Sequence, residues 1–371
     1  MSKKICIGCG IELQSDYPER NGYLPAAKLE EEGEHYCQRC FKIKNYGKYM
    51  PVRLTRDDYR KVVQEEMKNS QVAIAVFDII DFEGSFDDEI LDVLREMDSI
   101  VVINKLDLIP DEKHPSEVAN WVKVRLAEEG IAPLDIAIVS SKNGYGINGI
   151  FKKIKHFYPE GVEALVLGVT NVGKSSIVNR LLGLKKVTVS KYPGTTLKSV
   201  RNQIPHTKIT LIDTPGLIPE GRISDLVCEN CNLKMVPANE ISRKTFKMSK
   251  GRALIIGELL WFRVLNEDEN KPIFSLYAAK DVTFHETNYD KLKELLSGDR
   301  GDLLTPPCDE CREEYRKLEK ISQKITVKTG EELVFKGLGW ISVKRGPLEI
   351  EITAPKKAGI VIRDAFIKPK R

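Results

Sequence analysis

The chain has 371 residues, of which 42% are hydrophobic and 30% charged, as is ordinary for a globular protein, and its length suggests two or three domains. Its net charge of +4 is mild, so affinity for nucleic acid would have to come from local patches. No run of about 18 apolar residues occurs, and the opening MSKKICIGCG lacks the apolar core of a signal peptide. We therefore expect a cytoplasmic protein without a membrane segment, whose thiols stay reduced.

Residues 1–52 carry two of the four C-x-x-C pairs of the chain and have few periodic apolar segments. So short a segment cannot be stabilised by hydrophobic burial alone. In a reducing compartment metal binding is favoured over disulfides, and four thiolates make a closed structural zinc site. We predict a zinc ribbon. The alternative is two redox-active pairs. Such pairs usually begin a helix of a thioredoxin-like unit, and no such unit is expected in these residues. The expected zinc ligands are Cys6, Cys9, Cys37 and Cys40.

Residues 53–220 alternate short apolar strands with amphipathic helices, which is typical of a mostly parallel sheet with helices on both faces. The expected strands are 72–80, 99–104, 135–140 and 163–168. The expected helices are 57–67, 87–97, 116–130, 146–157 and 174–183. This pattern predicts an α/β nucleotide-binding domain.

The motif GVTNVGKS lies between an expected strand and an expected helix, the context that a phosphate-binding P-loop requires. Lys174 would reach the β- and γ-phosphates, and Ser175 would ligate Mg²⁺. A chance glycine-rich turn is the alternative, and the flanking elements argue against it. The expected phosphate-loop residues are Gly168, Thr170, Asn171, Val172, Gly173, Lys174, Ser175 and Ser176.

The segment NKLD ends an expected strand and supplies Asn104, Lys105 and Asp107. A carboxylate can accept both N–H groups of the guanine edge, whereas adenine offers no such pair, so this spacing indicates GTP rather than ATP. At the end of the next expected strand, SSK would add Ser140, a backbone N–H of Ser141, and Lys142 beside the base. By itself N-K-x-D is a weak signal that a solvated turn could also produce.

The segment LIDTPG provides Asp213 for the Mg²⁺ shell and Gly216 for the γ-phosphate, and PGTT lies between it and the P-loop. A switch threonine should close on Mg²⁺ there, and we expect Thr196 rather than Thr195. The expected catalytic set is Lys174, Thr196, Asp213 and Gly216.

These elements occur in a rotated order, with the base-reading segment ahead of the phosphate loop. Spatial proximity rather than chain order assembles a site, and domain termini often lie close enough for permutation. The chain resembles the YqeH-type circularly permuted GTPases and the related nitric-oxide-associated GTPases of plants and mitochondria. The likeness spans nearly the whole chain and is carried by CIGCG, CQRCFKIKNYG, DFEGS, GVTNVGKS, PGTT, DTPG and FKGLGW. It implies GTP hydrolysis coupled to maturation of the small (30S) ribosomal subunit, and a C-terminal β module similar to a tryptophan-responsive RNA-binding protein.

Leu217 occupies the position after D-T-P-G, where Ras-like GTPases place a water-orienting glutamine. Leucine cannot do this, so we expect slow intrinsic hydrolysis stimulated by potassium or by a partner. In related GTPases an asparagine like Asn171 accompanies a potassium ion between the phosphates. The alternative is that Asn171 only stabilises the loop turn.

Residues 221–371 have longer, β-leaning segments with a helical insertion, which predicts a β-rich domain that binds RNA or protein. They also hold the second set of cysteines, which departs from the usual pattern of the family. Either these cysteines converge on a second zinc ion or they are ordinary thiols. They are Cys228, Cys231, Cys308 and Cys311.

Two segments favour RNA binding. Residues 36–61 contain eight Lys/Arg against two Asp, interleaved with aromatic rings, and residues 321–371 carry eleven Lys/Arg against five Asp/Glu. We predict a monomeric GTPase that binds GTP or GDP, Mg²⁺ and Zn²⁺, and that contacts the small ribosomal subunit, its rRNA or ribosomal proteins. The rivals are a GTPase that acts on protein partners only and, less favoured, a C-x-x-C redox protein.

Overall fold

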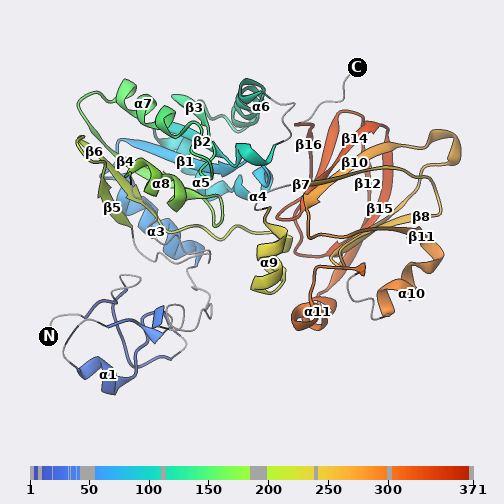
Figure 1. Cartoon of the computed structure of the whole chain (residues 1–371), viewed down its shortest axis with the longest axis horizontal. Coiled ribbons are helices and arrows are strands. Elements are labelled where there is room, and N and C mark those ends of the chain that lie inside the picture. Colours follow the sequence, from blue (N-terminus) through green and yellow to red (C-terminus); the bar gives the residue numbers. More distant parts are fainter. Residues whose placement is uncertain are drawn as a thin grey trace. The chain divides into compact units, whose positions relative to one another are not determined.

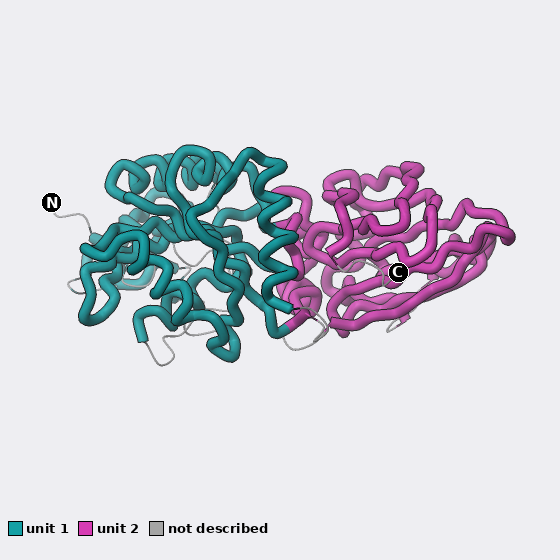
Figure 2. The backbone as a smooth tube through the Cα atoms, turned by 90° about the horizontal axis from the view of Figure 1, so that it is seen from above, with its two compact units in different colours: residues 1–79, 85–107, 114–219 teal, residues 80–84, 108–113, 220–371 magenta. Residues whose placement is uncertain are grey.

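The computed structural model describes residues 4–6, 11–18, 20–31, 33, 35–38, 40–41, 55–109, 114–183, 199–237, 241–298 and 303–366. The chain divides into two compact units (Figure 2). Unit 1 comprises residues 1–79, 85–107 and 114–219, and unit 2 comprises residues 80–84, 108–113 and 220–371. Within the described ranges, no helix combines the length and apolarity needed to span a bilayer.

Unit 1 is built on a six-stranded sheet with the spatial order β3-β2-β1-β4-β6-β5 (Figure 1). Every pairing in it is parallel except that of β5 with β6. Every residue of β1 and β2 is buried, which explains why these strands read as continuous apolar runs. The strands are β1 (Val72–Asp78), β2 (Ser99–Asn104), β3 (Asp135–Ile138), β4 (Val162–Leu167), β5 (Val200–Gln203) and β6 (Ile209–Asp213).

The path of the chain through this sheet determines where the helices lie. From β1 through β2 to β3 the strands step in one direction, and β4 then returns to the other side of β1. Because parallel crossovers are right-handed, α5 and α6 lie on one face of the sheet, and α7 lies on the other, where it packs against α8. The helices are α3 (Arg56–Met67), α5 (Asp88–Glu96), α6 (Pro115–Glu128), α7 (Ile147–Phe157) and α8 (Lys174–Leu181).

The described N-terminal residues form a small cluster rather than an extended sheet. It contains the helix α1 (Ala26–Glu30) and isolated bridges such as that between Cys6 and His35. Leu13 and Leu24 pack with three cysteine side chains at its centre. With so few apolar residues, burial contributes little to the stability of this segment.

Unit 2 contains two five-stranded antiparallel sheets that pack face to face. Their inner faces share one core, to which Phe274 and Ile341 contribute from one sheet and Phe262 and Ile350 from the other. The first sheet has the order β16 (Ile360–Asp364), β13 (Glu331–Phe335), β14 (Gly339–Arg345), β10 (Ile273–Ala279), β7 (Ile241–Lys247). The second has the order β11 (Phe284–Asn288), β8 (Arg252–Ile256), β9 (Leu260–Val264), β15 (Leu348–Pro355), β12 (Lys320–Val327).

The helices of unit 2 differ in part from the sequence-based expectation. The short helices α4 (Phe82–Ser85) and α9 (Glu229–Met235) were not expected, whereas α10 (Leu292–Ser297) and α11 (Asp309–Arg316) form the helical insertion. The sequence CREEYRKLEKI, residues 311–321, favours a helix throughout its length, but α11 ends at Arg316 and β12 begins at Lys320. Strand β12 is an exposed sheet edge, so its polar residues read as a continuation of the helix.

Candidate functional site

The P-loop begins where β4 ends, at the centre of the unit 1 sheet. Strand β1 leads through α5 to β2 on one side, and β4 leads through α8 toward β6 on the other, so the connections diverge between β1 and β4. In open α/β sheets ligands bind at such a point. A Cβ on Gly168 would lie 2.9 Å from the carbonyl oxygen of Val76 on β1. Glycine thus allows the loop to leave β4 close beside its neighbouring strand.

Gly173 ends the loop in a left-handed conformation, with φ of 90°, and α8 begins at the next residue. A Cβ at this position would lie 2.2 Å from the side-chain nitrogen of Asn104. Asn171 also has a positive φ, of 68°. This section of the loop therefore follows a backbone path that L-residues seldom adopt.

Lys174 occupies the first turn of α8, and only 6% of its surface is exposed. Its ammonium group donates to the carboxylate of Asp213 and to the carbonyl of Thr214. Ser175 and Ser176 follow in the same turn, and Asp213 ends β6. The structure thus gathers an ammonium group, hydroxyl groups and a carboxylate at one edge of the sheet, a donor set suited to phosphate and Mg²⁺.

Asn104 links three segments. Its side-chain nitrogen donates to the Val172 carbonyl at 2.8 Å and to Ser141 Oγ at 3.0 Å. Its side-chain oxygen accepts the backbone N–H of Ser141 at 2.8 Å. The end of β2, the loop after β3 and the P-loop are therefore joined through one buried amide, although they are remote from one another in sequence.

The residues beside Asn104 are held by separate contacts. Asp107 accepts a hydrogen bond of 2.6 Å from Ser140 Oγ. Lys105 adopts a positive φ of 67° and its ammonium group lies 2.5 Å from Asp78 Oδ2 at the end of β1. Lys142 is exposed. The structure thus brings together all of the sequence-predicted residues of the two base-recognition segments.

Two residues of this site were not found by sequence reasoning. Arg180 on α8 donates from Nε to the Ser141 carbonyl and from Nη2 to the Lys142 carbonyl, each at 2.5 Å, so it joins the P-loop helix to the SSK loop. Asp78 pairs with Lys105. The position of Asp78 at the end of a buried strand was a usable signal, since such strand ends carry ligand-binding residues. Arg180 had none, because a helical arginine is common on any protein surface.

The segment after β6 pairs with the P-loop through backbone hydrogen bonds. The backbone N–H of Thr170 donates to the Leu217 carbonyl at 2.8 Å, and the N–H of Leu217 donates to the Gly168 carbonyl at 3.3 Å. A Cβ on Gly216 would lie 3.2 Å from the methyl group of Thr170. The Leu217 side chain is only 2% exposed, so it packs inward. Thr195 and Thr196, the candidate switch threonines, lie outside the described residues.

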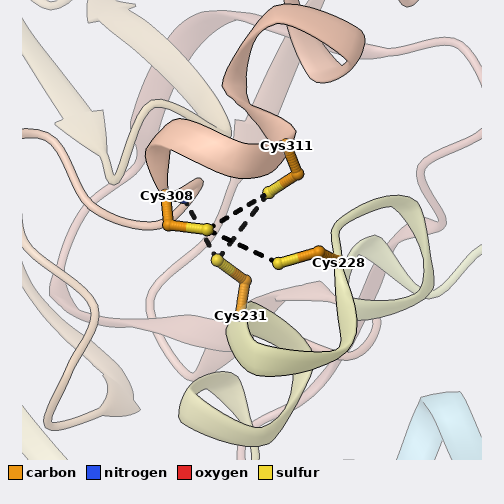
Figure 3. Close-up of side chains that lie close together, drawn as sticks. All are labelled: Cys228, Cys231, Cys308 and Cys311. Atoms are coloured by element: carbon orange, nitrogen blue, oxygen red, sulfur yellow. Dashed lines mark hydrogen bonds between the residues drawn. The ribbon is translucent and has the colours of Figure 1, made fainter. Parts of the chain in front are cut away.

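The two sets of cysteines each cluster in space. The sulfur atoms of Cys6, Cys37 and Cys40 lie within 4.8 Å of one another, and Cys9 lies outside the described residues. The backbone N–H of Cys37 donates to Cys6 Sγ at 3.2 Å. Three buried thiols in this arrangement could hold a zinc ion, with a fourth ligand completing a tetrahedron. The second set, in unit 2, also converges (Figure 3).

A P-loop at the centre of a parallel sheet, with the strand that carries NKLD placed earlier in the chain, defines a circularly permuted P-loop GTPase. Residues 163–252 match a family described as "50S ribosome-binding GTPase", and residues 271–366 match "YqeH-like, C-terminal". Uncharacterized protein YqeH of Bacillus subtilis (strain 168) is 31% identical over 373 residues, covering 99% of this chain and 100% of that protein. The chain therefore belongs to the YqeH family.

Two further relatives agree with this assignment. NO-associated protein 1, chloroplastic/mitochondrial, of Arabidopsis thaliana is 24% identical over 394 residues, covering 92% of this chain and 70% of its own. GTPase Der of Acetivibrio thermocellus is 29% identical over 187 residues, covering 45% of this chain and 40% of its own. The second similarity is thus confined to part of the chain.

Proposed function

We propose that this GTPase acts as a nucleotide-controlled switch in assembly of the small ribosomal subunit, and that it contacts the particle through ribosomal RNA. The observation that carries the nucleotide part is the network around Asn104, which joins the guanine-reading, base-supporting and phosphate-binding segments. The match of residues 163–252 to a family described as "50S ribosome-binding GTPase" supports contact with the ribosome. That description names the large subunit, so the small subunit is proposed from the resemblance to YqeH-type GTPases alone.

In this proposal the guanine base lies against the end of β2. The Asp107 carboxylate accepts two N–H groups of guanine, and the hydrogen bond from Ser140 keeps that carboxylate in place. The backbone N–H of Ser141, which the sequence assigned to the base, instead donates to Asn104 Oδ1, so it orients the base-support loop. The side chain of Lys105 packs against the base, and the ion pair with Asp78 keeps this side chain in place. A nucleotide with another base would therefore leave a buried acceptor unpaired, and these contacts select guanine for that reason.

At the phosphate end, the backbone of residues 168–176 wraps the anion, and Lys174 exchanges its contact with Asp213 for the β- and γ-phosphates. Ser175, Asp213 and Thr196 would hold the magnesium ion, which neutralises developing charge on the phosphates. Gly216 donates its backbone N–H to the γ-phosphate. Because Leu217 is buried and apolar, it does not position the attacking water. Intrinsic hydrolysis is therefore slow. Asn171 would hold a potassium ion that could supply the missing charge stabilisation, and a partner is the other source.

Contact with the ribosomal particle rests on the basic segments. Residues 36–61 hold eight Lys/Arg against two Asp, although residues 42–54 lie outside the described part of the chain. Cations meet phosphates and aromatic rings stack on unpaired bases. The N-terminal zinc site would hold this segment in shape. Ribosomal proteins remain additional partners, and the protein itself acts as a monomer.

Co-sedimentation with ribosomal subunits tests both parts of the proposal in one experiment. The wild-type protein should pellet with small subunits in the presence of a non-hydrolysable GTP analogue and much less with GDP. Asp107→Asn replaces one acceptor by a donor, which suits the extra carbonyl of xanthine. That variant should therefore pellet with the corresponding xanthosine analogue and not with the guanosine analogue.

The salt dependence of the same assay separates RNA from protein partners. Phosphate contacts release counterions, so RNA-mediated binding should weaken steeply with rising salt. Binding of the wild type that is independent of nucleotide would contradict the switch. Binding that depends on GTP but varies little with salt would favour the rival GTPase of protein partners.

A further inference from the structure

The four cysteines of unit 2 lie on two short helices that face each other (Figure 3). Cys228 is the residue before α9 and Cys231 lies in its first turn. Cys308 and Cys311 occupy the equivalent positions of α11. Each pair therefore presents its two sulfur atoms from the same point of a helix, and the two pairs meet although residues 232–307 separate them in sequence.

The distances between the sulfur atoms fit one metal ion. Sγ of Cys308 lies 3.5 Å from that of Cys228 and 3.9 Å from that of Cys311, and Sγ of Cys231 lies 3.8 Å from that of Cys311. All four lie within 4.8 Å of one another. In a tetrahedral site with metal–sulfur bonds of about 2.3 Å, sulfur atoms are separated by about 3.8 Å.

Other uses of four thiols fit these distances poorly. The thiols are not joined as disulfides, which would place two sulfur atoms about 2.0 Å apart, because Cys228 and Cys308 are 3.5 Å apart. An iron–sulfur cluster spreads its cysteine ligands around several metal atoms, whereas four sulfur atoms within 4.8 Å of one another leave room for a single ion. Zinc bound by four thiolates is the common closed site of this kind, and it leaves no open position for catalysis.

Contacts that do not involve sulfur hold α11 in place. The Tyr315 hydroxyl donates to the Leu259 carbonyl at 2.9 Å. Arg316 Nε lies 2.5 Å from Glu258 Oε1, and Arg312 Nε lies 3.3 Å from Glu258 Oε2. The turn between β8 and β9 thus anchors this helix, and with it Cys308 and Cys311.

A separate set of contacts holds α9. Asn232 Nδ2 donates to the Ser224 carbonyl at 2.7 Å and to Asp225 Oδ1 at 3.0 Å, and Met235 is buried in the core of unit 2. The backbone N–H of Cys308 donates to Cys231 Sγ at 3.1 Å, the kind of bond that stabilises a thiolate. Packing therefore places the ligands before any metal binds, which lowers the entropic cost of binding.

We propose that Cys228, Cys231, Cys308 and Cys311 bind a second, structural zinc ion that fastens α9 to α11 in unit 2. The ion cross-links the first residues after the GTPase segments to a helix that follows β11. A link across residues 232–307 restricts the unfolded chain, so removing the ion should lower the temperature at which unit 2 unfolds, as opening a covalent bridge does. This site is independent of the proposed ribosomal function, and its failure would leave that proposal intact.

Metal analysis of the full-length chain tests the proposal. Wild-type protein purified without chelators should contain two zinc ions per chain, one for each cysteine cluster. The C308S/C311S variant should retain one, as should the matched N-terminal variant C37S/C40S. Glu310→Gln is the control within the same motif, because Glu310 is exposed, and it should retain both. One zinc in the wild type, or a C308S/C311S variant with the wild-type zinc content, would overturn the proposal.

A second measurement uses protein whose unit 2 cysteines are intact. The C37S/C40S variant, reconstituted with cobalt, should show the intense visible absorption of tetrahedral sulfur coordination. A thiol-blocking mercurial should abolish this absorption and release one equivalent of metal. Absence of the absorption would contradict a tetrathiolate site even if C308S/C311S failed to fold, and iron in place of zinc in the native protein would overturn the identity of the metal.

Discussion

Gly173 packs so closely against Asn104 that a methyl group on Gly173 would lie 2.2 Å from the Asn104 side-chain nitrogen. The phosphate loop and the base-reading loop are therefore in direct contact. That nitrogen already donates to Ser141 and to the carbonyl of Val172, so it has no room to withdraw without losing both bonds. The positions of the two loops are therefore coupled, and a substitution that displaces one loop should displace the other.

Gly173→Ala should weaken GTP binding while leaving the fold intact. The residue has φ of 90°, which costs an L-residue about 1–3 kcal/mol, and the new methyl group would also displace Asn104. We expect affinity to fall by roughly 10- to 100-fold, since each 1.4 kcal/mol is a factor of ten. Calorimetric titration with GTP, alongside circular dichroism to check folding, would measure this.

Gly183→Ala is the matched control for that prediction. It lies just beyond the same helix, has φ of 68°, and a Cβ there meets nothing within 4 Å. It should suffer the backbone strain without the clash, so its GTP affinity should stay near that of the wild type. Equal losses in the two variants would mean that strain alone matters and that contact with Asn104 does not.

Arg180→Ala should reduce GTP affinity by about fivefold. The guanidinium group holds the carbonyls of Ser141 and Lys142, and Arg180 is exposed, so the bonds are worth about 1 kcal/mol in total. The loss should appear for GTP but not for inorganic triphosphate, which does not use the base-support loop. Arg201→Ala removes an exposed arginine that pairs with Glu66 and Glu163 instead, and should leave both affinities unchanged.

The central strands and the nucleotide motifs could be predicted because burial on both faces produces uninterrupted apolar sequence. Strands β1 and β2 are of this kind. Strands β5, β7 and β12 were missed because each lies at a sheet edge, where exposed positions carry polar residues. A polar edge strand has no periodicity that distinguishes it from a loop or, for β12, from the end of a helix.

Motif residues could be predicted one by one, but their connections could not. The pattern N-K-x-D gave no sign that Asn104 would bond to Val172, because the pairing depends on how two loops meet in space. Arg180 was missed for the same reason. The second set of cysteines shows both sides of this limit, since sequence located Cys228 and Cys308 but only the structure places their sulfur atoms 3.5 Å apart.

Asn171→Gly should distinguish a potassium ligand from a turn stabiliser. Asn171 has φ of 68°, a conformation that glycine adopts without strain, so this change removes the carboxamide and keeps the loop. We expect the wild type to hydrolyse GTP faster in KCl than in NaCl. Potassium would neutralise the charge that develops on the phosphates, whereas the buried, apolar Leu217 cannot stabilise it. The glycine variant should hydrolyse GTP at one slow rate in both salts and bind GTP about as well as the wild type does. Steady-state phosphate release at matched ionic strength would measure this. Equal wild-type rates in the two salts would exclude potassium, whereas a potassium response that survives in the variant would assign the ion to other ligands.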